Sequence, residues 1–303
     1  MKAIVLSEYG GPNQLVLREH PTPEPGAGQI KVRVASASIN PIDWKLRSGA
    51  YKAMMPLELP AVLGRDAAGK VVKIGAGVTQ FAVGDSVLGL VNGAYAEFVV
   101  AATEAWAKLP VGLDEVSAGA LPLVLLTGDQ LADATLGSAS AAGQTVLVTG
   151  ALGGVGRAAA WVAKQRGAKV LAGVRGKQVA EAQELGLDGV VALDDDAALA
   201  QLSPVDRIAD TVGGETIVRL LSKLKTGGTI GSVVGEPAGA KERGFTVNAF
   251  MAHPDSARLA LLSEAVAAGK LRIPIGRRFP LAEAATAQTL AEKGGIGKVL
   301  LVI

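Results

Sequence analysis

The chain has 303 residues, of which 49% are apolar and 19% charged, and at about 100–200 residues per domain it is long enough for two domains. This composition is typical of a soluble globular protein and excludes a disordered, collagen-like or disulfide-built chain. A net charge of +2 gives no strong field for nucleic acid or an anionic membrane, and the absence of cysteine excludes thiol nucleophiles, Fe–S clusters and cysteine-ligated zinc.

The histidines and the apolar runs argue against a metal site and a membrane span. The sequence has two histidines, His20 and His253. A zinc site needs three or four Cys, His or carboxylate ligands, and the sequence has no HxxxH or similar cluster, so we expect no bound metal. A membrane span needs about 20 apolar residues, and the run around Ala118–Leu126 is less than half of that. The apolar stretch Ala3–Leu6 is too short for a signal peptide, so the sequence predicts a cytoplasmic protein.

Short β-like segments and prolines dominate the first third of the chain. Seven of the 14 prolines lie in residues 1–60, and none lies between 123 and 203. Short runs of β-branched residues between turn-forming stretches predict an antiparallel, barrel-like domain. The strands that this pattern predicts are Ile30–Val34, Gly69–Ile74, Ser86–Leu90 and Tyr95–Val99.

From about Glu115 the pattern changes to apolar strands that alternate with helices. Unbroken apolar strands between helices predict an α/β domain with a doubly wound parallel sheet, covered on both faces. A first helical stretch is predicted over Val116–Thr135 and a last one over Ser256–Ala268, which Gly269 ends. Between them, strands are predicted at Thr145–Thr149, Lys169–Ala172, Gly189–Ala192, Arg207–Thr211 and Thr229–Val234, and helices at Val155–Arg166, Val179–Leu185 and Glu215–Leu224.

The C-terminal tail, Leu271–Ile303, returns to mixed β character. We expect a strand over Arg272–Ile275, a helix near Leu281–Lys293 and a final strand over Lys298–Ile303. We interpret this tail as completing the first domain, which makes the parallel-sheet domain an insertion. The predicted domains are therefore residues 1–115 with 270–303, and residues 116–269.

A glycine-rich segment follows the predicted strand Thr145–Thr149 and opens a helix. Glycines let the backbone turn tightly and approach a diphosphate, and the helix N-terminus supplies N–H groups and a partial positive charge. In a βαβ series this arrangement predicts dinucleotide binding, and the alternative is a structural turn that binds nothing. The residues assigned to this loop are Gly150, Gly153, Gly154, Val155 and Gly156.

Two bases follow the next predicted strand, where an NAD enzyme usually carries Asp or Glu for the ribose 2′-hydroxyl. Arg175 and Lys177 stand there, and two cations suit the dianionic 2′-phosphate of NADPH. The alternative is that both are solvated loop bases. The acidic run Asp194–Asp196 would repel this phosphate if it lay close.

The positions of the tyrosines exclude one family of reductases. The segment Thr149–Gly156 also fits the glycine fingerprint of short-chain dehydrogenases, which need a later Tyr-x-x-x-Lys to donate a proton. Tyr9, Tyr51 and Tyr95 all precede the loop, and none has Lys four residues further on. The proton donor of that family is therefore missing.

Several other motifs point to a different family. Asn40–Gly49 with Tyr51 has the pattern Asn-Pro-x-Asp-x-Lys-x-Arg, and in Pro60–Gly69 the residue Arg65 stands where zinc alcohol dehydrogenases have the histidine of Gly-His-Glu. With these motifs the chain resembles the zinc-independent quinone and enone reductases of the medium-chain dehydrogenase/reductase superfamily. Further similar segments are Gly77–Val87, Gly93–Glu97, Asp210–Gly214 and Gly297–Val302.

The resemblance implies a Rossmann domain, a chaperonin-like (GroES-like) β-barrel domain, an active site between them and a homodimer. It also implies NADPH as the cofactor and hydride transfer, without zinc, to a quinone or to the C=C of an α,β-unsaturated carbonyl. We therefore expect a small-molecule substrate, no nucleic-acid partner and no membrane span.

The resemblance assigns roles to individual residues as well. Lys45 is expected near the nicotinamide amide and the substrate carbonyl, where it would stabilise negative charge on the oxygen. Tyr51 would add an O–H donor, and Asn40 would orient the nicotinamide ribose; the alternatives are a solvated base, simple packing and a turn former. Further cofactor contacts implied by position are Thr127, Val233, Val234, Gly235, Phe250 and Met251, and Leu193 stands where many relatives have a tyrosine near the 2′-phosphate.

Two other functions stay open at this point. One is an enoyl-thioester reductase on the same fold, which would need a basic groove for phosphopantetheine that the sequence does not show. The other is a non-catalytic NADPH-binding protein with a structural or RNA-associated role. The donors at Asn40, Lys45 and Tyr51 argue against the second.

Overall fold

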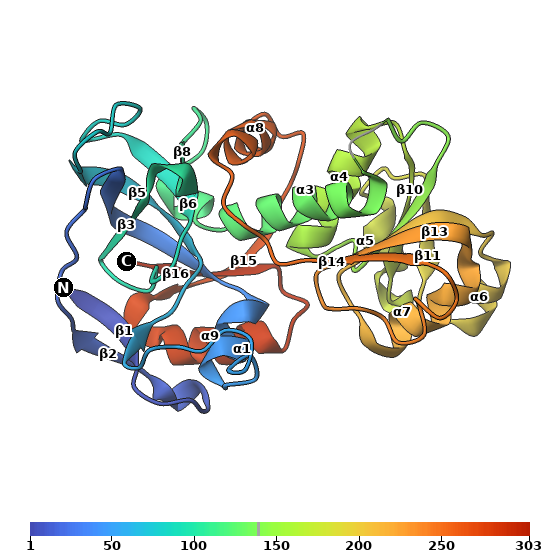
Figure 1. The fold of residues 1–303 in the computed structure, drawn as a ribbon, viewed down its shortest axis with the longest axis horizontal. Helices are drawn as coiled ribbons and strands as arrows, with labels where there is room; N and C mark the ends of the chain where they lie inside the picture. The colour runs from blue at the N-terminus through green and yellow to red at the C-terminus, as the bar shows by residue number, and fades with distance from the viewer. Residues whose placement is uncertain (138–139) are drawn as a thin grey trace. The chain divides into compact units, whose positions relative to one another are not determined.

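The proline- and β-rich segments form two sheets in a computed structural model, which describes residues 1–137 and 140–303 (Figure 1). The smaller sheet has the order β2-β1-β4, and the larger has the order β15-β16-β3-β5-β6-β8 with β7 also paired to β3. Only β15 and β16 pair in parallel among the strand pairs described for these two sheets. Their bounds are β1 Lys2–Leu6, β2 Leu15–Glu19, β3 Gln29–Ile39, β4 Ala61–Val62, β5 Asp66–Ile74, β6 Ser86–Leu90, β7 Phe98–Ala102, β8 Trp106–Lys108, β15 Ile275–Pro280 and β16 Lys298–Val302.

Helix α1 begins directly after β3 and carries the predicted site residue Lys45. Its first residue is Pro41, which suits the first turn because no hydrogen bond is lost there. The Asp43 carboxylate accepts a 2.8 Å hydrogen bond from the Asn40 N–H, which closes the amino end of the helix. At the other end, Arg47 donates to Gln288 at 2.6 Å and thereby ties α1 to α9. The helices near these sheets are α1 Pro41–Arg47, α2 Glu115–Ala118, α8 Ser256–Ala267 and α9 Ala284–Glu292.

The segment in which strands alternate with helices forms one six-stranded sheet with the order β11-β10-β9-β12-β13-β14, and every strand pairing in it is parallel. This confirms the predicted α/β fold with a doubly wound sheet, whose order reverses between β9 and β12. The strands are β9 Thr145–Thr149, β10 Lys169–Val174, β11 Gly189–Ala192, β12 Val205–Asp210, β13 Leu224–Ser232 and β14 Thr246–Ala249. The helices are α3 Pro122–Leu136, α4 Gly154–Gln165, α5 Val179–Gln183, α6 Asp196–Gln201 and α7 Gly214–Leu220. Short 3-10 helices lie at Pro12–Gln14, Thr103–Ala105, Gly176–Gln178, Leu221–Lys223 and Leu281–Glu283.

The chain divides into two compact units, Met1–Leu123 with Pro254–Ile303, and Val124–His253. These boundaries differ from the predicted 115/116 and 269/270. Helix α8 is the reason for the second difference, because it contacts β8 and the 3-10 helix Thr103–Ala105 of the first unit.

Three predicted elements need correction. The helix expected over Val116–Thr135 is two helices, because Gly119 packs against β3 and Pro122 begins a new helix. The strand expected at Tyr95–Val99 begins only at Phe98, which pairs with β3, because the backbone of Tyr95 bonds to Ile4 and Leu63 instead. A strand is expected at Arg272–Ile275, but the observed strand, β15, begins at Ile275 and runs to Pro280.

Across residues 1–137 and 140–303, we find no helix that is both apolar and long enough to traverse a bilayer.

Candidate functional site

Most of the predicted cofactor residues follow strands of the six-stranded sheet at one of its edges, whereas Thr127 lies in α3 and Asn40 and Lys45 belong to the other unit. All six strands are parallel, so the segments that follow β9, β10, β13 and β14 leave the sheet at the same edge. β9 pairs with β10 on one side and with β12 on the other, which is the point where the strand order reverses. Nucleotides bind at such a point in open α/β sheets.

The glycine loop after β9 has the backbone that a diphosphate cradle requires. Gly150 has φ +63°, a left-handed conformation that favours glycine. A Cβ added at Gly156 would lie 2.3 Å from the Gly150 carbonyl oxygen, so α4 and the loop approach too closely for any side chain there. Gly153 precedes the first turn of the 12-residue helix α4, whose N–H groups face this loop. The loop therefore fits the diphosphate of a dinucleotide.

A buried polar network, which the sequence motifs do not assign to the site, joins the strand ends next to this loop. Asp210, at the end of β12, is fully buried and accepts hydrogen bonds from Thr149 at 2.8 Å and from Ser232 at 3.2 Å. The Thr211 hydroxyl donates to the Thr149 carbonyl at 2.7 Å. These bonds join the carboxyl ends of β9, β12 and β13. A polar residue at the end of each apolar strand is the signal that could have revealed them.

The two predicted phosphate-binding bases lie in the loop after β10, and both are exposed. Asp194 contacts this loop. Its Oδ1 accepts a 2.6 Å hydrogen bond from the N–H of Gly176, the residue between Arg175 and Lys177. Asp194, the first residue of the acidic run Asp194–Asp196, therefore reaches the predicted 2′-phosphate site, where its charge would repel a phosphate. Leu193 is buried in the core beside it.

The remaining cofactor candidates lie beyond β13 and β14 and in α3. The Phe250 N–H donates to the Ser232 carbonyl at 3.2 Å, and Phe250 and Val233 pack against the same apolar cluster. Val234 and Met251 are exposed, Gly235 has φ +107°, and Thr127 is buried in α3. Val233, Val234 and Gly235 thus follow one strand of the sheet, and Phe250 and Met251 follow its neighbour.

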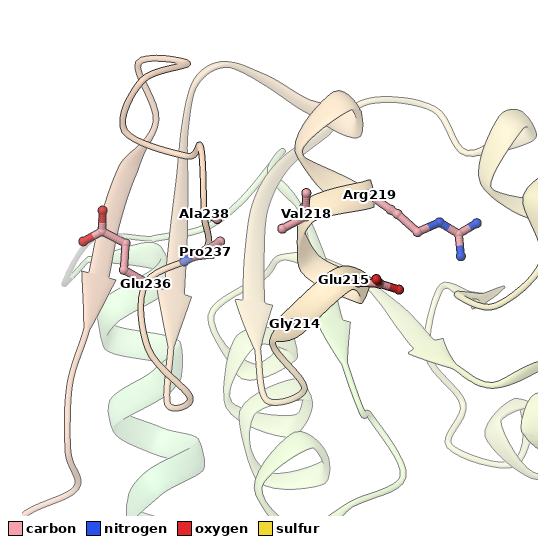
Figure 2. A pocket seen from close by; sticks show the side chains of 7 residues that line it. All are labelled: Gly214, Glu215, Val218, Arg219, Glu236, Pro237 and Ala238. Carbon is pink, nitrogen blue, oxygen red and sulfur yellow. The ribbon is translucent and has the colours of Figure 1, made fainter.

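A cavity of about 530 Å³ lies at the same edge, between α7 and the residues after Gly235. Figure 2 shows that the charged ends of Glu236 and Arg219 are directed away from it, so Val218, Pro237 and Ala238 give it an apolar lining. None of the predicted cofactor residues lines this cavity.

The first unit brings two predicted catalytic residues into contact. The Lys45 ammonium donates a 3.0 Å hydrogen bond to the Tyr51 hydroxyl and lies 5.0 Å from the centre of the tyrosine ring. Both side chains are half-buried. The backbone supports the pair, because the Tyr51 N–H donates to the Lys45 carbonyl at 3.3 Å. An ammonium that donates to a phenol oxygen leaves the phenol proton free for a third partner.

Asn40 precedes the helix that carries Lys45, and its side chain lies in a buried network of its own. Its side-chain amide donates to Asp66 at 2.8 Å and to the Ser38 hydroxyl at 3.2 Å, while its oxygen accepts from Lys298 at 2.5 Å. Asp66 also accepts from the Leu123 N–H at 2.6 Å. The exposed fraction of Asn40 is 1%, so its amide serves these internal contacts and positions α1.

Asp43, whose carboxylate accepts the Asn40 N–H, is an ionisable group with a shifted pKa. Burial raises the pKa of Asp43 to about 7, against the opposing effect of hydrogen bonds from the Tyr95 hydroxyl and the Asn40 N–H. Burial and the Asp43 charge raise the pKa of Tyr95 well above its usual value. Burial lowers the pKa of Lys298, and Asp66 and Asp43 oppose that effect. Asp43 Oδ1 is buried and has no hydrogen-bond partner in the described part of the chain.

Within residues 1–137 and 140–303, no three or more His, Cys, Asp or Glu side chains are grouped as a metal site would need.

Comparison with known proteins identifies both parts of the chain. Residues 26–111 match the alcohol dehydrogenase GroES-like domain, and residues 185–301 match the domain described as zinc-binding dehydrogenase. The quinone oxidoreductase of Rattus norvegicus is 31% identical over an alignment of 330 residues. This alignment covers 100% of this chain and 98% of the relative.

Solved structures agree over the full length. The quinone oxidoreductase of Coxiella burnetii has a TM-score of 0.89 at 33% identity and covers 100% of this chain and 99% of its own. A mycobacterial protein complexed with NADPH has a TM-score of 0.85 at 29% identity and covers 100% of both chains. The chain is therefore an oxidoreductase that belongs to the quinone oxidoreductase family of the medium-chain dehydrogenase/reductase superfamily.

Proposed function

We propose that this protein is an NADPH-dependent, zinc-independent reductase of quinones or of the C=C bond of α,β-unsaturated carbonyl compounds. The observation that carries the proposal is the 3.0 Å hydrogen bond from Lys45 to Tyr51, because it forms a proton donor without any metal ligand. The relatives that act on quinones and the neighbour complexed with NADPH support the choice of acceptor and cofactor.

Residues of the six-stranded sheet would hold the cofactor. Gly150, Gly153 and the N–H groups of Gly154, Val155 and Gly156 would bind the diphosphate. Arg175 and Lys177 would bind the 2′-phosphate, and Val233–Gly235 with Thr127, Phe250 and Met251 would contact the nicotinamide half. When bound, NADPH supplies a hydride.

The Lys45–Tyr51 pair would supply the proton. A quinone or enone that accepts a hydride gains negative charge on its carbonyl oxygen, and that oxygen needs a donor. The Tyr51 hydroxyl would donate its proton to this oxygen, and the Lys45 ammonium would stabilise the phenolate that is left. One hydride and one proton reduce a quinone to the hydroquinone, or an enone to the enol that becomes the saturated ketone.

Asn40 and Asp43 would act as positioning residues in this mechanism. Asn40 is the N-cap residue of α1 and Asp43 closes its first turn, so both fix the helix that carries Lys45. This revises the role expected for Asn40 at the nicotinamide ribose, because its amide is 1% exposed and bonded to Asp66, Ser38 and Lys298.

The acceptor class is tested by following NADPH oxidation with 1,4-benzoquinone, 9,10-phenanthrenequinone and methyl vinyl ketone. Turnover with either class supports the proposal, and the ratio of kcat/KM values assigns the enzyme to quinones or enones. NADPH binding without turnover of any acceptor would favour the non-catalytic NADPH-binding protein. A cytoplasmic homodimer is part of the same proposal, and size-exclusion chromatography with light scattering tests the dimer.

A further inference from the structure

A carboxylate from the segment after β11, the neighbouring strand, contacts the loop after β10. β10 and β11 pair in parallel up to Val174 and Ala192, and the Leu193 N–H donates to the Val174 carbonyl at 2.7 Å just beyond them. This places Asp194 opposite Gly176, where its Oδ1 accepts the Gly176 N–H at 2.6 Å. The side chain of Asp194 is exposed.

The position of this carboxylate matters for a dinucleotide. Proteins that bind NAD on such a sheet carry an acidic residue about 20 residues past the glycine loop, and it accepts a hydrogen bond from the ribose 2′-hydroxyl. In this chain the corresponding segment has Arg175 and Lys177 instead. Asp194 brings a carboxylate to the same loop from β11, the next strand.

We propose that Asp194 shifts cofactor specificity toward the free 2′-hydroxyl of NADH and thereby lowers the preference for the 2′-phosphate of NADPH, within the cofactor site of the function proposed above. Two physical effects carry this inference. The Asp194 charge repels a dianionic 2′-phosphate in the same loop. Its carboxylate also occupies the Gly176 N–H, a donor that the phosphate would otherwise use.

Arg175 and Lys177 act in the opposite direction. Neither base forms an ion pair with Asp194 within 4.0 Å among the residues that the structure describes, so Asp194 does not neutralise them through direct contact. The loop thus holds two cations suited to a phosphate and one anion suited to a hydroxyl. The enzyme should accept both cofactors, and Asp194 should reduce its preference for NADPH.

The two following residues provide matched controls, because each has the same charge and another partner. Asp195 accepts the N–H groups of Ala197 and Ala198 at the start of α6. Asp196 forms an ion pair with Arg219, and its side chain is 96% exposed. Asp196→Asn removes one negative charge two residues away from Asp194 and leaves the contact with Gly176 intact.

The test measures the Kd values of wild type, Asp194→Asn and Asp196→Asn for NADPH and NADH by calorimetry, together with kcat/KM for both. Asparagine keeps an oxygen for the Gly176 N–H, so it removes the charge while it preserves the local structure. We expect Asp194→Asn to raise the ratio Kd(NADH)/Kd(NADPH) by about tenfold, and Asp196→Asn to change it less than about twofold.

An unchanged ratio in Asp194→Asn would overturn the inference. An equal change in both variants would also overturn it, because a general charge effect would then suffice. Binding separates this result from the proposed function. If wild type binds both nucleotides and reduces no acceptor, the reductase proposal fails while the Kd ratio still decides the role of Asp194. If neither nucleotide binds, both proposals fail.

Discussion

The ammonium of Lys298 donates a hydrogen bond of 2.5 Å to the side-chain oxygen of Asn40 and lies 3.7 Å from the Asp66 carboxylate. Lys298 begins the last strand, β16, whereas Asn40 precedes α1, so the end of the chain fixes the helix that carries Lys45. All three residues are at most 8% exposed. Removal of one partner from such a buried group leaves an uncompensated charge.

Lys298→Met should lower the free energy of unfolding by about 3–5 kcal/mol, because it leaves the buried Asp66 carboxylate without its cation. Urea denaturation measures this loss. Lys293→Met, an exposed lysine five residues earlier, should change the same quantity by less than about 0.5 kcal/mol. Equal free energies of unfolding of the two variants would show that the buried ion pair does not stabilise the fold.

The pKa of Asp43 predicts a pH dependence of stability. Its pKa is raised from 3.8 to about 7 in the folded state, so between these values the folded chain holds a proton that the unfolded chain releases. The stabilisation is complete below about pH 4 and is lost as the pH rises to about 7. The free energy of unfolding of wild type minus that of Asp43→Asn should therefore fall across this range, by up to about 4 kcal/mol. A difference that is constant from pH 4 to pH 8 would contradict the raised pKa.

Lys45→Met and Tyr51→Phe should each lower kcat with enones and quinones by at least about tenfold, because each removes part of the proposed proton donor. The Kd for NADPH should stay within a few-fold in both variants. Lys52→Met is the matched control, since Lys52 is exposed and adjacent to Tyr51. If kcat is unchanged in Lys45→Met, Lys45 has no part in the reaction.

The double change Arg175→Ala and Lys177→Ala should raise the KM for NADPH by about 10- to 100-fold and leave the KM for NADH within about threefold. Only the 2′-phosphate distinguishes the two cofactors, and these bases are exposed at its predicted site. Lys169→Ala provides a control, because Lys169 is an exposed base at the opposite end of β10. Equal increases for both cofactors would reject a 2′-phosphate role.

The local elements of this fold could be predicted because each has its own pattern. Ser86–Leu90, Thr145–Thr149 and Gly189–Ala192 are strands with the predicted bounds, since each is a short apolar run between turns. The glycine loop was predicted for the same reason, as a glycine cluster between a strand and a helix. Helix α1 was not predicted, because seven residues are too few to show a helical period.

The contacts between side chains of different strands and loops could not be predicted, because they join residues that are far apart in the chain. Asn40, Asp66 and Lys298 meet only through the register of β3, β5 and β16. Asp194 and Gly176 likewise meet through the register of β10 and β11. The sequence indicates that the acidic run Asp194–Asp196 would repel a phosphate, but only the parallel pairing of these strands determines which of its carboxylates reaches the loop.

Anaerobic oxidation of NADPH by 9,10-phenanthrenequinone, catalysed by protein dialysed against a chelator, tests the central proposal most directly. We predict saturable turnover that added zinc does not increase, with equimolar formation of the hydroquinone. A metal-free protein that neither binds NADPH in a parallel titration nor reduces the quinone would contradict the proposed reaction.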